Sequence, residues 1–286
     1  MGKQVNRNAA LSPFARKLMT ISAAVFGLVG LILFLMPNWA AANFSWKISP
    51  MAAMTMGGWY LGTAVMAGIV ARRRRWNVIY ASVLYLGTFS VTESIVLVIH
   101  RARINLDAAL AWPYIGMLAM GVFTAIVVLS DWWHQKPTLT DEGGPVAAWA
   151  RVVIWSFIFF VFSLSAFAFS AQWTGVGLGG GVFPEPLTLF TLRSFGAFYF
   201  SLAFSVCALV RIRRADALTL HVQGGTALIV CITLAALVNF QRFNFSEKPL
   251  QTIYLGVYLA ALFLSVLYLW QLRKVPPAGG GQQFGG

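Results

Sequence analysis

Glu93 is the acidic residue that the sequence places deepest inside a long apolar run, and it is the first candidate for chemistry. It stands in the segment "FSVTESIVLVIH". A helix ending near Ile99 would put it about 9 Å below that end, at 1.5 Å per residue. Carboxyl groups inside a membrane are costly and by default indicate a functional site. The alternative is a structural role, in which Glu93 joins helices by hydrogen bonds with nearby Ser90, Thr92 and Ser94.

His100 follows Glu93 by seven residues, which places the two on nearly the same helix face, two turns apart. Other polar side chains gather at the same predicted outer surface, namely Arg101, Arg103, Asp107, Arg193, Arg242 and Asn244. Such a cluster could bind an anionic headgroup or a small anion through charge-assisted hydrogen bonds. Long side chains that snorkel to water would account for the same residues. Arg193 is expected either to pair with Glu185 or to contact a ligand.

The three histidines, His100, His134 and His221, fall at an outer helix end, in a linker and near an inner helix end. A metal site needs convergent ligands, so three histidines on different membrane sides cannot share one ion. The sequence has no pair such as H-x-x-x-H or C-x-x-C, and no Walker or nucleophile-elbow motif. It therefore indicates no metal or cofactor and leaves catalytic residues unknown. A single histidine as axial ligand of a pigment or haem stays open.

The elements that must position these residues are membrane-spanning helices. The 286 residues are 59% hydrophobic and 10% charged, with a mean hydropathy of +0.74, which is too apolar for a soluble globule. A helix needs about 20 mostly apolar residues to cross a bilayer. Suitable runs lie near 18–36, 51–71, 77–99, 110–130, 150–171, 192–210, 217–240 and 252–272. We therefore predict an all-α membrane protein with about eight transmembrane helices in contact with the lipid bilayer.

Basic residues are unevenly divided between the two predicted sides of the membrane. Fifteen of the 21 Lys and Arg residues fall on one side and six on the other. This bias predicts a multi-pass protein of the cytoplasmic (inner) membrane with both termini in the cytoplasm. The predicted anchors to anionic lipid headgroups at that face are Arg72, Arg73, Arg74, Arg75, Arg211, Arg213 and Arg214. The net charge of +13 therefore reflects topology, and nucleic acid is not an expected partner.

An internal duplication relates the two halves of the chain. With a shift of 139 residues, "GGWYLGTAVMAGIVARRRR" (57–75) aligns with "GAFYFSLAFSVCALVRIRR" (196–214), and Arg103 and Asn105 align with Arg242 and Asn244 after short gaps. Four helices per half predict parallel repeats related by an axis along the membrane normal. The predicted division is a four-helix repeat at 1–130, a cytoplasmic linker at 131–149, a second repeat at 150–274 and a disordered Pro/Gly-rich tail at 275–286.

Two segments of the second half contain short motifs, "FPEPLTLFTLRSFGAFYFSLAF" (183–204) and "NFQRFNFSEKPLQTIYLGVYL" (239–259). In the first, Pro-Leu-Thr followed by Arg and Gly opens a helix, and in the second an Arg-Phe-Asn turn precedes one. Both resemble a pattern found in uncharacterised polytopic membrane proteins of bacteria. The resemblance implies this architecture and a bacterial origin, and it implies no activity.

Three functional hypotheses follow. The first is a non-catalytic integral membrane protein, because the spans hold few polar groups. It would be either an accessory subunit that contacts other membrane subunits or a protein that binds an apolar or lipid-like ligand between its halves. The second is a small proton-coupled transporter that uses Glu93. The third is a membrane enzyme acting on a lipid or isoprenoid, with Glu93 and His100 as acid and base, which requires both side chains to face one cavity.

Overall fold

The structure is a computed structural model that describes residues 9–139, 146–175, 177–179, 181–210 and 215–274. In these residues the chain is almost entirely helical, and the only β pairing is a single bridge between Ala10 and Arg75. The elements are α1 (Pro13–Leu35), α2 (Pro37–Ala42), α3 (Pro50–Arg73), α4 (Trp76–Ile99), η1 (Arg101–Arg103), α5 (Ala111–Gln135), α6 (Ala148–Thr174), α7 (Leu189–Cys207), α8 (Ala215–Val238), η2 (Phe240–Arg242) and α9 (Gln251–Lys274).

Eight of these helices, all except the six-residue α2 and the two 3₁₀ turns, are long and apolar enough to cross a membrane. The predicted number of spans is confirmed. Local sequence sets several helix ends. Ser12, Ser49 and Thr188 cap the first turns of α1, α3 and α7 with their hydroxyl oxygens, which accept otherwise unpaired backbone N–H groups. Gly175 ends α6 with a φ of 69°, in the left-handed region where glycine carries no steric penalty.

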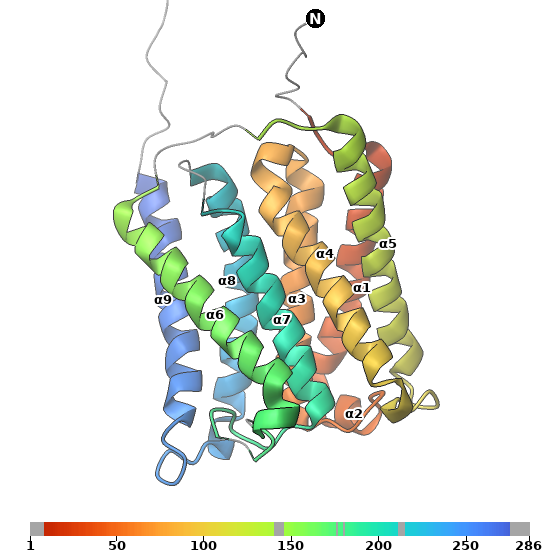
Figure 1. Ribbon diagram of the computed structural model, residues 1–286, viewed down its shortest axis with the longest axis vertical. Coiled ribbons are helices and arrows are strands. Elements are labelled where there is room, and N and C mark those ends of the chain that lie inside the picture. The colour runs from red at the N-terminus through yellow and green to blue at the C-terminus, as the bar shows by residue number, and fades with distance from the viewer. Residues whose placement is uncertain (1–8, 140–145, 176, 180, 211–214, 275–286) are drawn as a thin grey trace, which may run out of the picture.

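The centre of the bundle is formed by α3, α4, α7 and α8 (Figure 1). Helix α3 packs against α1 and α8, and α7 packs against α6 and α4. Helices α1 and α5 lie on one side of this centre, and α6 and α9 lie on the other. In their most apolar stretches 72% of α3 and 78% of α7 are buried, against 11% of α9. Most of the buried polar side chains lie on the central helices, whereas most of α9 is exposed at the surface of the bundle.

Three glycines let α3 approach its neighbours closely. A Cβ atom at Gly57 would lie 2.6 Å from the backbone nitrogen of Phe34 in α1. A Cβ atom at Gly62 would lie 2.5 Å from the Cα atom of Leu228 in α8, and one at Gly58 would lie 3.2 Å from Cys231. Small residues at four-residue spacing are the usual device for tight helix packing in membranes. Gly58 and Gly62 thus fix how closely α3 and α8 pack.

The two ends of the bundle differ in charge. We call the basic end the one where α1 and α6 begin and α3 and α5 end, which carries Arg72 to Arg75 and Arg151. The opposite end carries His100, Arg193 and the pair formed by Arg242 and Glu185. Helix α1 begins at the basic end and α9 ends there, so the chain enters the first span and leaves the last span on the same side of the bundle (Figure 1).

The tight contact at Gly62 leads to a testable prediction. We expect Gly62→Ala to destabilise the protein by about 1–3 kcal/mol relative to Gly68→Ala, because the new methyl group would overlap Leu228. Gly68 lies on the same helix, and a Cβ atom there meets nothing within 4 Å, so both variants share the helix-propensity gain of alanine. Thermal unfolding in detergent measures the difference. Equal melting temperatures for the two variants would contradict the close approach.

Candidate functional site

Glu93 lies in α4 and is fully buried. The hydroxyl of Tyr114, on α5, donates a 2.8 Å hydrogen bond to its Oε1 atom, while its Oε2 atom has no hydrogen-bond partner among the described residues. Neither of the two cavities described below is lined by Glu93. The carboxyl group is therefore enclosed by packed helices. Burial of a charge without a cationic partner is costly, which favours the neutral, protonated acid.

Two further hydroxyls stand close to this carboxyl group. Ser194, on α7, lies beside Glu93, and the Tyr60 hydroxyl, on α3, lies beside that of Tyr114. Neither makes a hydrogen bond of normal geometry with the described residues. We call Glu93, Tyr60, Tyr114 and Ser194 the Glu93 cluster. It brings together side chains from α3, α4, α5 and α7, so it joins three central helices to α5.

Ser90 and Ser94 were expected to form a polar site with Glu93, and the structure does not bring their hydroxyls to the carboxyl group. The Ser90 hydroxyl donates to the carbonyl of Leu86 at 2.9 Å, and the Ser94 hydroxyl donates to that of Ser90 at 2.7 Å. Both bonds run back along α4, the common arrangement for serine within a helix. The expected partners on α4 are thus replaced by tyrosine and serine residues of other helices.

His100 lies one residue beyond α4, and its ring stacks on Phe190 with 4.7 Å between ring centroids. Phe190 in turn stacks on Trp46 at 3.8 Å. Arg193 donates to His100 Nε2 at 3.1 Å and to Gln172 Oε1 at 2.6 Å. Partial burial and the positive charges of Arg193 and Arg103 lower the pKa of His100 below its ordinary value of 6.5. His100 therefore accepts from Arg193 as a neutral imidazole.

Glu93 and His100 do not form an acid–base pair around a common cavity. Their positions differ by seven residues, or about 10 Å along α4. Glu93 is enclosed in the bundle centre, whereas His100 stacks on Phe190 at the end of the bundle that lies opposite the basic end. The condition that the enzyme hypothesis set for these two residues is not met.

The candidate anion cluster at this end is divided into separate groups. Arg193 binds His100, and the expected pair between Arg193 and Glu185 is wrong, because Glu185 instead accepts from Arg242 at 3.3 Å and from Ser49. The side-chain amide of Asn244 donates to Glu247 at 2.7 Å. Three others lie at the exposed turn after α4, namely Arg101, Arg103 and Asp107. No single anion site unites all six predicted residues.

The predicted headgroup anchors are only partly described. Arg72, Arg73, Arg74 and Arg75 are exposed at the turn between α3 and α4, where Arg74 adopts a φ of 58°. Arg211, Arg213 and Arg214 lie outside the described residues, as does the tail at 275–286. The exposed group has the position required of a lipid anchor, and its role stays a prediction.

The larger of two cavities among the described residues is a groove that the sequence did not predict. It has a volume of about 540 Å³ and lies among α6, α7, α8 and α9, with Phe160, Leu164, Ile229 and Leu264 among its walls. On α9 the lining runs from Ile253 to Tyr268, a length of about 22 Å. We call this space the α6–α9 groove. It lies within the second half of the chain, whereas the sequence-based hypothesis expected a ligand between the halves.

His221, on α8, lines the groove and connects three helices. Its Nδ1 atom lies 3.2 Å from the Ser82 hydroxyl and its Nε2 atom lies 3.4 Å from the Ser205 hydroxyl. Ser205 donates its only hydroxyl hydrogen to the carbonyl of Leu202, so His221 must donate from Nε2 and accept at Nδ1. With both nitrogens occupied, His221 is poorly suited to ligate a haem or pigment. No group of three or more His, Cys, Asp or Glu side chains in the described residues could hold a metal ion.

No protein-family model, curated protein or solved structure matches the chain. The geometry itself defines the class, a multi-pass helical membrane protein. The resemblance to polytopic bacterial proteins stays a prediction.

The hydrogen bond within the Glu93 cluster can be tested with two matched variants. We expect Tyr114→Phe to cost about 1–3 kcal/mol of stability, because it leaves Glu93 Oε1 buried and unpaired. Tyr60→Phe removes a buried hydroxyl that has no partner of normal geometry and should change stability little. Thermal unfolding in detergent compares the two. A loss for Tyr60→Phe as large as that for Tyr114→Phe would mean that the Tyr60 hydroxyl is also bound.

The environment of His100 predicts a pH dependence. A histidine whose pKa is lower in the folded than in the unfolded state destabilises the fold when it is protonated. Stability should therefore fall as the pH drops below about 6.5, until it passes the folded-state pKa. His100→Gln should lose this part of the acid sensitivity, since glutamine can still accept from Arg193. Melting temperatures measured from about pH 8 to about pH 5 would contradict the assignment if both proteins lost stability in parallel.

Proposed function

We propose that this membrane protein is non-catalytic and binds an apolar or lipid-like molecule in the α6–α9 groove. The single observation that carries the proposal is the groove itself. Its volume of about 540 Å³ falls within the range of about 300–1,000 Å³ that small-molecule sites occupy. Its walls are mostly aliphatic and aromatic, and it is elongated along α9. An extended hydrocarbon chain fits this shape and chemistry.

The opposite side of the bundle supports the idea that the groove is a specific feature. There α1 packs against α5, and a Cβ atom at Gly87 of α4 would meet Ala125 of α5 at 3.4 Å. On the groove side, α6 and α9 make at most marginal contact through described residues, and a Cβ atom at Gly225 of α8 would meet nothing within 4 Å. The chain thus closes one side and leaves the corresponding space on the other side open.

We further propose that the chain consists of two parallel four-helix repeats. The packing supports this. If the halves correspond, α3 is equivalent to α7 and α4 to α8, so the contact of α3 with α8 should have an equivalent between α7 and α4. Both contacts are present. A 3₁₀ turn follows both α4 and α8, and these turns end at the aligned residues Arg103 and Arg242. The excess of arginine at the basic end supports the proposal that this end is cytoplasmic in an inner membrane.

The alternatives receive less support. In a transporter, Glu93 would have to reach a hydrated path, yet it lies in an enclosed cluster and does not line the groove. In an enzyme, Glu93 and His100 would have to share a cavity, and they are separated. An accessory subunit would dock helices of other subunits against the exposed apolar faces, but no particular contact favours one face.

Filling the groove tests the proposal. Gly225→Trp places an indole in the groove without a backbone clash, and it should lower the occupancy of a bound apolar molecule about tenfold or more. Gly116→Trp is the matched control, because Gly116 also faces open space but lies on α5, away from the groove. Native mass spectrometry of the purified protein, titrated with diacylglycerol, measures the occupancy. Equal binding by both variants, or none by the wild type, would contradict the proposal.

A further inference from the structure

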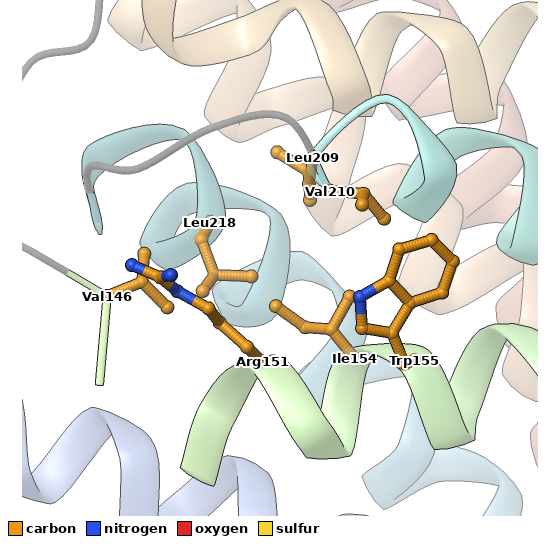
Figure 2. Close-up of a pocket in the computed structure, with 7 residues that line it drawn as sticks. All are labelled: Val146, Arg151, Ile154, Trp155, Leu209, Val210 and Leu218. Atoms are coloured by element: carbon orange, nitrogen blue, oxygen red, sulfur yellow. The ribbon is translucent and has the colours of Figure 1, made fainter. Parts of the chain in front are cut away.

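A small cavity adjoins the α6–α9 groove at the basic end of the bundle. It has a volume of about 30 Å³ and is lined by Val146, Arg151, Ile154, Trp155, Leu209, Val210 and Leu218 (Figure 2). Ile154 and Leu218 also line the groove, so the two spaces share a wall. The groove therefore ends next to the positively charged side chain of Arg151.

Arg151 is the charged group of this small cavity. Its guanidinium extends toward Val146, at the beginning of α6 (Figure 2). It makes no ion pair or side-chain hydrogen bond with any described residue. Helix α6 begins after Ala147, which provides no capping side chain, so the first backbone N–H groups of the helix have no side-chain acceptor among the described residues. A guanidinium next to an uncapped helix start is a suitable environment for a phosphate group.

Tyr268 provides a second, independent indication of a polar ligand. It lines the basic end of the groove and is only 8% exposed. Its hydroxyl is buried without a hydrogen-bond partner of normal geometry, although it lies near Thr219. It packs in one cluster with Val146 and Leu218, which line the small cavity. A buried hydroxyl in this position would gain a partner from a ligand with a polar group at the end of an apolar chain.

We propose that the ligand of the groove is a phospholipid whose phosphate binds Arg151, whose polar backbone reaches Tyr268 and whose acyl chain lies in the groove. This inference rests on the proposed function. Asp216 also lies near Tyr268 and would repel negative charge there, so the phosphate is assigned to Arg151 and the uncharged backbone of the lipid to Tyr268. A transmembrane helix of a partner protein fits less well. Apart from its last turn, its backbone groups are already paired internally, so its main chain offers few acceptors to Arg151 or Tyr268.

The experiment compares two lipids with identical chains by native mass spectrometry, phosphatidylglycerol and diacylglycerol. We expect the wild type to bind phosphatidylglycerol about tenfold or more tightly than diacylglycerol, because the phosphate adds charge-assisted hydrogen bonds. Arg151→Gln should bring phosphatidylglycerol down to the affinity of diacylglycerol, and Arg151→Lys should keep part of the preference. Lys17→Gln, which removes an exposed cation at the same end on α1, should keep all of it. Tyr268→Phe should weaken binding of both lipids while preserving the fold.

The possible failures are distinguishable. Suppose that Gly225→Trp abolishes binding of both lipids, while the wild type and Arg151→Gln each bind phosphatidylglycerol and diacylglycerol with the same affinity. The groove then holds a ligand and the headgroup assignment is wrong. If the wild type binds neither lipid, the proposed function itself is wrong. A third result would also overturn the inference. If the protein binds inorganic phosphate as tightly as phosphatidylglycerol, and Gly225→Trp leaves phosphate binding unchanged, the acyl chain contributes nothing to the affinity.

Discussion

The close approach of α3 to its neighbours is the constraint on which the rest of the bundle depends. Lipid chains are as apolar as leucine side chains, so helices in a bilayer associate mainly through tight packing and hydrogen bonds. Gly57 lets α3 approach α1, and Gly58 and Gly62 let it approach α8. Because α3 is held from both sides, Tyr60 lies beside the other members of the Glu93 cluster, and α8 is fixed in the position from which Gly225 and His221 line the groove.

The same helix order gives a closed side and an open side. Helices α1 and α5 pack together, whereas α6 and α9 leave the groove between them. The polar groups follow this division. Glu93 joins the centre to α5 on the closed side, while Arg151 and Tyr268 lie where the groove ends.

The sequence predicts the number of spans because hydrophobic length is a local property, and all eight expected runs correspond to helices. It also identifies Glu93, since a carboxyl group in an apolar run stands out by residue type alone. It does not identify Tyr114 as the partner, nor the contact between His100 and Arg193, because such contacts depend on how helices distant in the chain are rotated against each other. The groove is hardest to foresee. It consists of contacts that are not made, and hydrophobic periodicity carries no signal for a missing contact.

The positions of the polar groups determine which helix contacts would have to open for a ligand to reach them. A path through Glu93 would have to separate α3, α4 and α7, where Phe89 packs edge to face against Phe198 and Trp59 stacks on Phe198. Opening it would break these ring contacts together with the glycine packing of α3, and close-packed interiors deform only at considerable cost. The groove lies beside α9, the helix that is least buried in the bundle, so the proposed ligand would enter from the lipid without disturbing the centre. Ligand exchange and a rigid core are therefore compatible in this fold. The Glu93 cluster is best understood as part of that core, and selectivity between lipids is expected from the groove's polar end.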